Sequence, residues 1–349
     1  MQSSVGNSGT GYSRADRILH QIALGFAPVL EMSFDLERAR YGRSAAALSV
    51  DRPVFVCGLA RAGTSVLMRL LHATDAFASL SYRDLPFPLA PNSWARLGKG
   101  RSVAAHERGH GDGLLHDLDT PEAIEEVFWR VEEGPRYLTP EGLVPVRPYP
   151  DTVEAFGAYV RLVLLRYGRA RYLSKNNNNI LRLGALVEAF PDVALLHPFR
   201  DPLQQAASLF NQHRRARALQ AEDGFRRKFM GWLGHHEFGA DQRPFLLPGA
   251  PTGNRDHIDY WLTSWISVHR WLLDRPEPVR ARQAFLDYDR LCAGGDAVEI
   301  AGVRVSLAGL RAPDVRPVEG ASAELVEQAR QVHAELSRRA SEPAGSATG

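Results

Sequence analysis

The fold of this chain is decided by the stretch Val54-Phe-Val-Cys-Gly-Leu-Ala-Arg-Ala-Gly-Thr-Ser-Val-Leu-Met68. Its apolar run ends at Gly58, a short loop ends at Gly63, and an apolar helical pattern begins at Thr64. A buried strand, a glycine-bounded loop and a helix N-terminus together bind phosphate groups through backbone N–H groups and the helix dipole. The stretch therefore predicts an α/β protein with a phosphate-binding loop.

This loop differs at one position from the nucleotide-hydrolase loop G-x-x-x-x-G-K-S/T. The two glycines keep the spacing, but Thr64 stands where the lysine would be, and the cation of the loop is Arg61. The missing lysine argues against a magnesium-dependent NTPase and against an ATP kinase. The residues expected to hold an anion are Gly58, Arg61, Ala62, Gly63, Thr64 and Ser65.

A second segment ends in another candidate anion ligand. Residues 193–199 form an apolar run typical of a buried strand, and a helical pattern that carries Ser208 begins after Arg200-Asp-Pro202. Ligands of open α/β sheets bind at the carboxyl ends of the strands, so Arg200 and Ser208 are expected to grip a terminal phosphate. Asp201 and Pro202 suit the cap and the first turn of that helix.

Together, the loop G-x-x-R-A-G-T-S and the segment strand–R-D-P–(five residues)–S resemble the PAPS-dependent sulfotransferase family. PAPS is 3′-phosphoadenosine 5′-phosphosulfate. The resemblance covers about residues 50 to 290, and roughly 140 residues separate the two motifs. It is closest to bacterial members of the family whose acceptor has not been assigned. It implies a central parallel sheet of nucleoside-kinase-like topology with additional helices. It also implies that the first motif holds the 5′-phosphosulfate, that the second holds the 3′-phosphate, and that no metal ion takes part.

Sulfuryl transfer makes demands that such a loop can meet. The reaction is an in-line displacement with little covalent help from the protein, so positioning and charge stabilisation dominate. Arg61 would face the phosphate oxygens on which charge builds, and Thr64 and Ser65 would add hydroxyl donors. Charge-assisted contacts of this kind contribute about 1.5–3 kcal/mol each.

The general base for the acceptor hydroxyl is left open by the sequence. The resemblance implies a carboxylate or histidine at about the place of Asp84, and the polar segment 106–112 offers His110 as an equal candidate. Glu122 and Glu125 follow as weaker candidates. We expect the base in a loop within residues 82–126.

Lys175 ends an expected strand and precedes four asparagines, Asn176 to Asn179. Bacterial relatives often have a proline soon after this lysine, which this chain lacks. We expect Lys175 to reach the phosphosulfate or the acceptor, and Asn179 to cap the following helix. The other asparagines either bind acceptor hydroxyls or complete a turn.

The remaining periodicity predicts alternating helices and strands, which implies parallel pairing with crossover helices. Further strands are expected over 171–175 and 284–288. Helices are expected over 14–41 (one or two, divided near Pro28), 64–72, 121–130, 152–167, 180–190, from 203, over 260–273 and over 322–338. Residues 73–120 are irregular, as in a substrate loop or lid. Trp261, Trp265, His269 and Trp271 recur at helical spacing and are expected in the core, whereas Trp94 and Trp129 are candidates for sugar contact.

The composition bounds the partners and the domain count. The 349 residues suit one α/β domain over 14–339, with an acceptor region at about 73–150 and disordered ends at 1–13 and 340–349. A net charge of +2 gives no case for nucleic-acid binding. Lysine occurs only at 99, 175 and 228, and the other 39 of the 42 basic residues are arginine, which suits bidentate contact with phosphate and sulfate.

The two cysteines, Cys57 and Cys292, support neither a disulfide framework nor a zinc site. Neither a membrane-length apolar run nor a secretory signal pattern occurs, so a cytoplasmic location is expected.

The expected function is transfer of a sulfuryl group from PAPS to a hydroxyl acceptor, with a carbohydrate or glycolipid favoured. A small-molecule natural product or a peptide tyrosine is the alternative acceptor. A non-catalytic nucleotide-binding protein that keeps the fold is the alternative of another class. The sequence leaves the regiochemistry and the oligomeric state undetermined.

Overall fold

The structure, a computed structural model, describes residues 13–97, 106–107, 115–116, 123–308, 310–312 and 314–342. Its centre is a five-stranded sheet in the order β2-β5-β1-β6-β7, and each neighbouring pair of strands is parallel. These strands are β1 (Val54–Val56), β2 (Phe77–Ala78), β5 (Arg171–Lys175), β6 (Ala194–Phe199) and β7 (Gln283–Asp287). The predicted α/β class with a central parallel sheet is confirmed.

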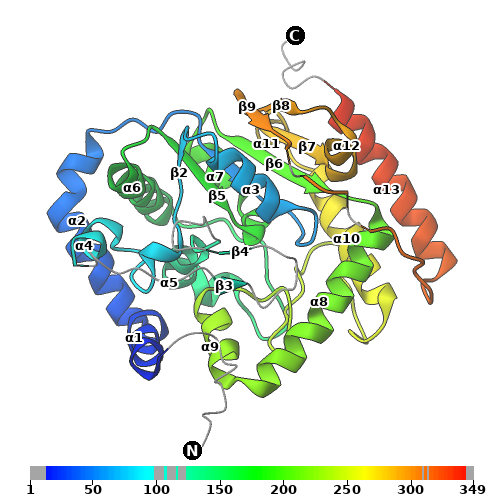
Figure 1. The fold of residues 1–349 in the computed structure, drawn as a ribbon, viewed down its shortest axis with the longest axis horizontal. Coiled ribbons are helices and arrows are strands. Elements are labelled where there is room, and N and C mark those ends of the chain that lie inside the picture. The colour runs from blue at the N-terminus through cyan, green and yellow to red at the C-terminus, as the bar shows by residue number, and fades with distance from the viewer. Residues whose placement is uncertain are drawn as a thin grey trace, which may run out of the picture.

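Helices surround this sheet, and Figure 1 shows α10 and α13 covering the end at β7. Two short antiparallel hairpins, β3 (His106–Glu107) with β4 (Leu115–His116) and β8 (Ala297–Ile300) with β9 (Val303–Ser306), lie outside it. The α-helices are α1 (Arg14–Gly25), α2 (Ala27–Ala46), α3 (Thr64–His72), α4 (Pro91–Leu97), α5 (Glu126–Tyr137), α6 (Pro150–Tyr167), α7 (Leu183–Ala189), α8 (Pro202–Glu222), α9 (Gly224–Trp232), α10 (Ile258–Leu273), α11 (Glu277–Arg280), α12 (Tyr288–Ala293) and α13 (Ala323–Ser341). The 3-10 helices η1 (Tyr82–Asp84) and η2 (Asn177–Leu181) follow β2 and β5.

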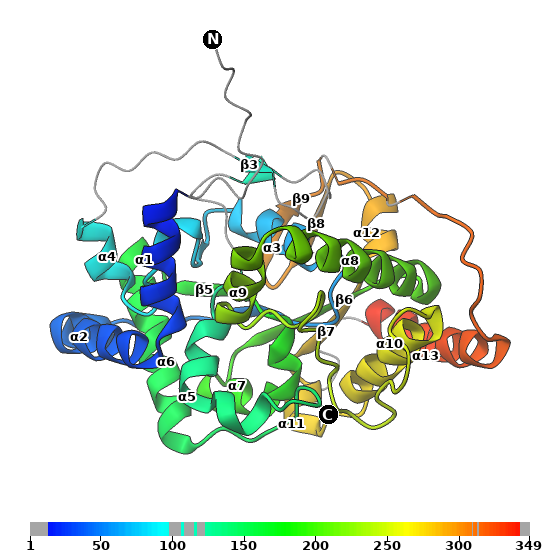
Figure 2. The ribbon, with the colours of Figure 1, turned by 90° about the horizontal axis from the view of Figure 1, so that it is seen from below.

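Two hydrophobic cores lie on the two faces of the sheet because successive side chains of a strand point in opposite directions. Phe55 packs in the larger core with residues of α6 and α7. Val54 and Val56 pack in the second core with residues of α3 and the β8–β9 hairpin. Figure 2 shows α3 above the strands and α7 below them. The phosphate-binding loop is therefore held between two packed layers.

The N-terminal segment forms two helices that divide at Phe26, one of the alternatives expected near Pro28. Leu30 and Phe34 of α2 are buried, whereas Ile18, Ile22 and Phe26 are about half exposed. They are exposed because α1 packs against the core through a narrow side that has Ala23 and Leu24 at its centre.

Two helix boundaries also differ from the prediction. The helix predicted over 121–130 begins at Glu126 and continues through Pro135 to Tyr137, because the burial of its aromatic side chains outweighs the low helix propensity of Gly134 and Pro135. The helix predicted from Ile180 begins at Leu183, after the 3-10 turn η2. Asn179 does not cap it. Instead, Asn176 caps the 3-10 turn by accepting a hydrogen bond from the N–H of Asn178.

Other elements were predicted well or were missed altogether. The helices α3, α6, α8, α10 and α13 and the strands β5, β6 and β7 lie within a few residues of the predicted ranges. Asp201 caps α8 as predicted, by accepting a hydrogen bond of 2.9 Å from the N–H of Gln204. The strand β2, the helices α4 and α9 and both hairpins were not predicted. Within the described residues, each helix is too short or too polar to span a bilayer.

Candidate functional site

The carboxyl ends of four strands bring the two motifs to one edge of the sheet. The phosphate-binding loop, Gly58 to Ser65, follows β1, Arg200 follows β6, and Lys175 ends β5 in register with Val56 of β1. Tyr288 follows β7, which pairs with β6. Ligands of open α/β sheets bind at this edge, where the order of strands reverses between β5 and β6.

The backbone of the loop is fixed in a form that few residues adopt. Gly63 precedes α3 with φ 82°, and Arg61 inside the loop has φ 68°. A Cβ on Gly63 would lie 2.2 Å from Cδ2 of Tyr288, so only glycine fits there. Within the described residues, no side chain caps α3, and its first N–H groups stay suited to an anion.

A buried glutamine of α8 holds the first half of the loop. Nε2 of Gln205 donates hydrogen bonds of 3.3 Å to the carbonyl of Leu59 and of 2.9 Å to the carbonyl of Ala60. Its Oε1 accepts a hydrogen bond of 2.9 Å from Nε1 of Trp265. These bonds occupy carbonyl oxygens that would otherwise repel an anion. Gln205 was not among the predicted site residues, although it lies three residues before Ser208, on the same side of a helix.

The two motifs touch. Nε of Arg61 donates a hydrogen bond of 3.0 Å to Oγ of Ser208. Arg200 is buried, with a side-chain exposure of 10%, and its Nε lies 3.6 Å from Oδ1 of Asp289. Within the described residues this Nε has no hydrogen-bond partner, so the guanidinium is held near one carboxylate without being saturated.

Tyr288 closes the other side of the loop. Burial raises its pKa to about 12, so its hydroxyl stays protonated at neutral pH. Tyr288 was predicted to lie in the last strand and was not among the predicted site residues. Its position directly after a strand of the parallel sheet was the available signal.

The family model described as the sulfotransferase family matches residues 53–242, which is more than half of the chain and includes both motifs. The chain belongs to the sulfotransferase family. The solved structure of sulfotransferase STF1 from Mycobacterium tuberculosis H37Rv is similar, with 15% identity, a TM-score of 0.45, and coverage of 96% of this chain and 88% of that one. Sulfotransferase STF9 from Mycobacterium avium is similar over 94% of this chain and 79% of its own, with 15% identity and a TM-score of 0.43. A comparison with curated proteins gave no match.

Asp84 of this sulfotransferase lies in a structural cap. It is 1% exposed, and Oδ2 accepts hydrogen bonds from the N–H of Ser81 and the hydroxyl of Tyr167. Its Oδ1 lies 4.0 Å from Nε of Arg166. Burial raises the pKa of Asp84, and these donors oppose the rise. The geometry favours a role in fixing the segment after β2. The other leading candidate for the base, His110, and the weaker candidate Glu122 lie outside the described residues.

Glu125 belongs to a buried polar network. It accepts hydrogen bonds from Tyr172, Trp129, Asn176 and Asn179. Trp129 is 1% exposed, so its predicted contact with a sugar was wrong, and the side chain fills the core instead. The predicted core role of the α10 aromatics is confirmed: Trp261, Trp265 and His269 are buried, and Trp271 packs against the core.

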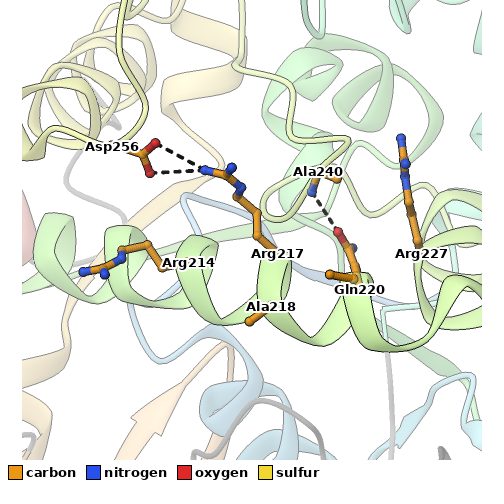
Figure 3. A pocket seen from close by; sticks show the side chains of 8 residues that line it. Arg214, Arg217, Ala218, Gln220, Arg227, Ala240 and Asp256 are labelled. Atoms are coloured by element: carbon orange, nitrogen blue, oxygen red, sulfur yellow. Dashed lines mark hydrogen bonds and ion pairs between the residues drawn. The ribbon is translucent and has the colours of Figure 1, made fainter.

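A separate pocket lies between α8 and α9, away from the two motifs. Figure 3 shows this pocket, which is lined by Arg214, Arg217, Arg227, Gln220, Asp256 and alanines. Its volume is about 560 Å³. Its arginines are largely neutralised, because Arg217 pairs with Asp256 at 3.2 Å and Arg227 pairs with a neighbouring aspartate at 2.6 Å. The residues of the two motifs do not line it. The described residues also contain no group of three or more His, Cys, Asp or Glu side chains arranged to hold a metal ion.

Proposed function

We propose that this sulfotransferase moves the sulfuryl group of PAPS to the hydroxyl group of an acceptor and releases adenosine 3′,5′-bisphosphate. The observation that carries the proposal is the 3.0 Å hydrogen bond from Nε of Arg61 to Oγ of Ser208. It joins the loop suited to the 5′-phosphosulfate to the helix suited to the 3′-phosphate. This contact supports a site with two anion-binding parts, as the bisphosphate requires.

The residues at this edge of the sheet fit the two charged ends of PAPS. The N–H groups of the loop and the N-terminus of α3 suit the 5′ group, because a helix N-terminus attracts negative charge. Arg200 suits the 3′-phosphate, because its buried Nε has no hydrogen-bond partner within the described residues. A phosphate oxygen would supply that partner.

The reaction needs little covalent chemistry from the protein. The acceptor oxygen forms a bond to sulfur, the bond from sulfur to the bridging oxygen breaks, and the electron pair moves onto the 5′-phosphate of the leaving bisphosphate. Arg61 and the loop N–H groups stabilise that charge, which grows in the transition state. The acceptor proton leaves to a base.

We favour a carbohydrate or glycolipid acceptor, with a small natural product or a peptide tyrosine as alternatives. The turn after β5 supports a hydroxyl-rich ligand, because the side-chain oxygens of Asn177 and Asn178 are buried without hydrogen-bond partners within the described residues. Hydroxyl groups of an acceptor would donate to such oxygens. Lys175 stays a candidate for contact with the phosphosulfate or the acceptor.

The test is a thermal-shift comparison of adenosine 3′,5′-bisphosphate with 5′-AMP and ATP, on the wild type and on Arg200→Ala. We expect selective stabilisation by the bisphosphate, and its loss in the variant. Arg214→Ala is the matched control, because Arg214 is an arginine of α8 that lines the separate pocket. Equal stabilisation by ATP, or no stabilisation by any of the three, would contradict the proposal. Transfer of radiolabelled sulfate from PAPS then separates an enzyme from a non-catalytic binding protein.

A further inference from the structure

The turn after β5 holds a carboxylate that neither motif uses. Nδ2 of Asn177 donates a hydrogen bond of 2.8 Å to Oε1 of Glu237, and Nδ2 of Asn178 donates one of 3.2 Å to the carbonyl of Gly234. These bonds fasten the segment that follows α9 onto the turn that follows Lys175. Glu237 is thereby placed at the carboxyl edge of the sheet.

The strand order puts Glu237 on a defined side of the loop. The order β5-β1-β6 places the phosphate-binding loop in the middle, Arg200 on one side, and Lys175 and Glu237 on the other. If Arg200 holds the 3′-phosphate and the loop holds the 5′-phosphate, the terminal sulfuryl group extends away from β6. The group to be transferred then lies on the side of Glu237. This step rests on the proposed function.

On the β5 side of the loop, Glu237 is more exposed than Asp84, Glu125 and Glu126, whereas the exposed Asp289 lies on the opposite side, next to Arg200. Asp84, Glu125 and Glu126 are at most 2% exposed, and each accepts two or more hydrogen bonds from neighbouring groups. Glu237 is partly exposed, and its carboxylate accepts hydrogen bonds from Nδ2 of Asn177 and from its own backbone N–H. The carboxylate is thus fixed by two hydrogen bonds on a side chain that stays partly exposed, as a base that meets an acceptor requires.

We propose that Glu237 is the general base that removes the acceptor proton, with Asn177 as its positioning residue. The acceptor oxygen bonds to sulfur as its proton moves to Oε2 of Glu237. The bond from sulfur to the bridging oxygen breaks, and its electron pair stays on the phosphate next to Arg61. The proton on Glu237 is then released to water after the bisphosphate and the sulfate ester leave.

The charges around Glu237 agree with this role. Burial raises the pKa of Glu237. The neighbouring His235 and Lys175 and the hydrogen bond from Asn177 lower it by more than burial raises it, so the net shift is downward. The side chain is therefore the carboxylate, which is the form that a base requires, at neutral pH.

The experiment measures donor binding and sulfuryl transfer separately on Glu237→Gln and Glu237→Asp. Calorimetry with adenosine 3′,5′-bisphosphate should give the wild-type affinity within about twofold for both variants. Transfer from radiolabelled PAPS to water, which needs no identified acceptor, should fall by about 10²–10⁴-fold in Glu237→Gln, as expected for a lost general base. Glu237→Asp should restore part of the rate. The acid limb of the pH profile should disappear in Glu237→Gln.

Glu188→Gln is the matched control, because Glu188 is exposed and pairs with Arg147 on the surface. The proposal is overturned if Glu237→Gln keeps the wild-type rate or the acid limb. It is also overturned if the wild type binds the bisphosphate but does not accelerate the decay of PAPS, since a base beside the sulfuryl group would activate water. Failure of the bisphosphate to bind would instead overturn the proposed function.

Discussion

The ring of Tyr288 occupies the space that a side chain on Gly63 would need: Cδ2 of the ring lies 2.2 Å from the position of a Cβ. Gly63 has φ 82° and precedes α3. Tyr288 follows β7, at the far edge of the sheet. The last strand thus sets the shape of a loop that begins more than 200 residues earlier in the chain.

Gly63→Ala should distort the loop and abolish binding of the bisphosphate. The left-handed backbone costs an alanine about 1–2 kcal/mol, and the overlap with the Tyr288 ring adds to that cost. Urea denaturation measures the loss of stability, and calorimetry measures the loss of binding. Gly168→Ala is the control, because Gly168 has φ 64° with nothing within 4 Å of a Cβ. It should show the backbone cost alone, and equal effects of the two changes would contradict the steric argument.

Ser208→Ala should weaken bisphosphate binding by about tenfold or more. Ser208 holds the guanidinium of Arg61 at 3.0 Å, and hydrogen bonds to charged groups contribute about 1.5–3 kcal/mol. A double-mutant cycle with Arg61→Ala checks the coupling by calorimetry. We expect strongly non-additive losses, because each change removes the same contact. Additive losses would show that the two residues act on the ligand independently.

Asp289→Asn should tighten the bisphosphate, whereas Arg200→Ala should weaken it. Asp289 lies 3.6 Å from Nε of Arg200 and also accepts a hydrogen bond of 3.1 Å from the N–H of Asp201. Asparagine keeps an acceptor for that N–H but removes the negative charge that competes with a 3′-phosphate. Affinities for the bisphosphate and for 5′-AMP should be measured at two salt concentrations. The gain should appear for the bisphosphate alone and shrink at high salt.

The sequence predicted the parts of the site that follow local rules. A strand followed by a glycine-bounded loop, and an arginine after a strand, are local patterns, and both led to residues that lie at the same edge of the sheet. Cys57, between the first strand and the loop, is buried, and burial raises the pKa of its thiol.

The partners that shape the loop were not predictable in the same way. Gln205, Tyr288 and Glu237 reach the site through packing between distant segments, and no short motif marks such contacts. Trp129 was placed wrongly for a related reason. Its burial depends on an arginine, Arg182, that stacks on its ring at 4.6 Å from a later turn of the chain.

Glu126→Gln should destabilise the protein by about 3–5 kcal/mol, because it leaves a buried cation without its counter-charge. Arg182, with a side-chain exposure of 3%, pairs with Glu126 at 3.1 Å. Glu277→Gln is the control, because the pair of Glu277 with Arg280 at 2.6 Å is exposed and such pairs contribute about 0.2–1 kcal/mol. Urea denaturation of both variants measures the difference. Similar losses would mean that the buried pair is not the anchor of this network.

His197 should make the protein less stable as the pH falls from about 6.5 to about 4. Burial lowers its pKa to about 4, although the hydrogen bond to the carbonyl of Cys57 opposes that shift. Nδ1 donates to this carbonyl at 2.6 Å, and Nε2 accepts from Nε2 of Gln283 at 3.0 Å, so both nitrogens suit the neutral ring. Between pH 6.5, the ordinary pKa of histidine, and about pH 4, its pKa in the folded protein, the unfolded chain binds a proton at His197 that the folded protein does not. The free energy of unfolding therefore falls by up to about 1.4 kcal/mol per pH unit for this histidine.

His197→Gln removes this titration and should flatten the dependence of the unfolding free energy on pH within that window. The measurement is urea denaturation at several pH values on the wild type, on His197→Gln and on His257→Gln. His257, with a side-chain exposure of 54%, is the comparison at an exposed position. His213 and His269, whose pKa values burial lowers to about 4 and about 3, add slope of the same sign in all three proteins. The slopes must therefore be compared as differences, and an unchanged slope in His197→Gln would mean that His197 accepts a proton in the folded protein.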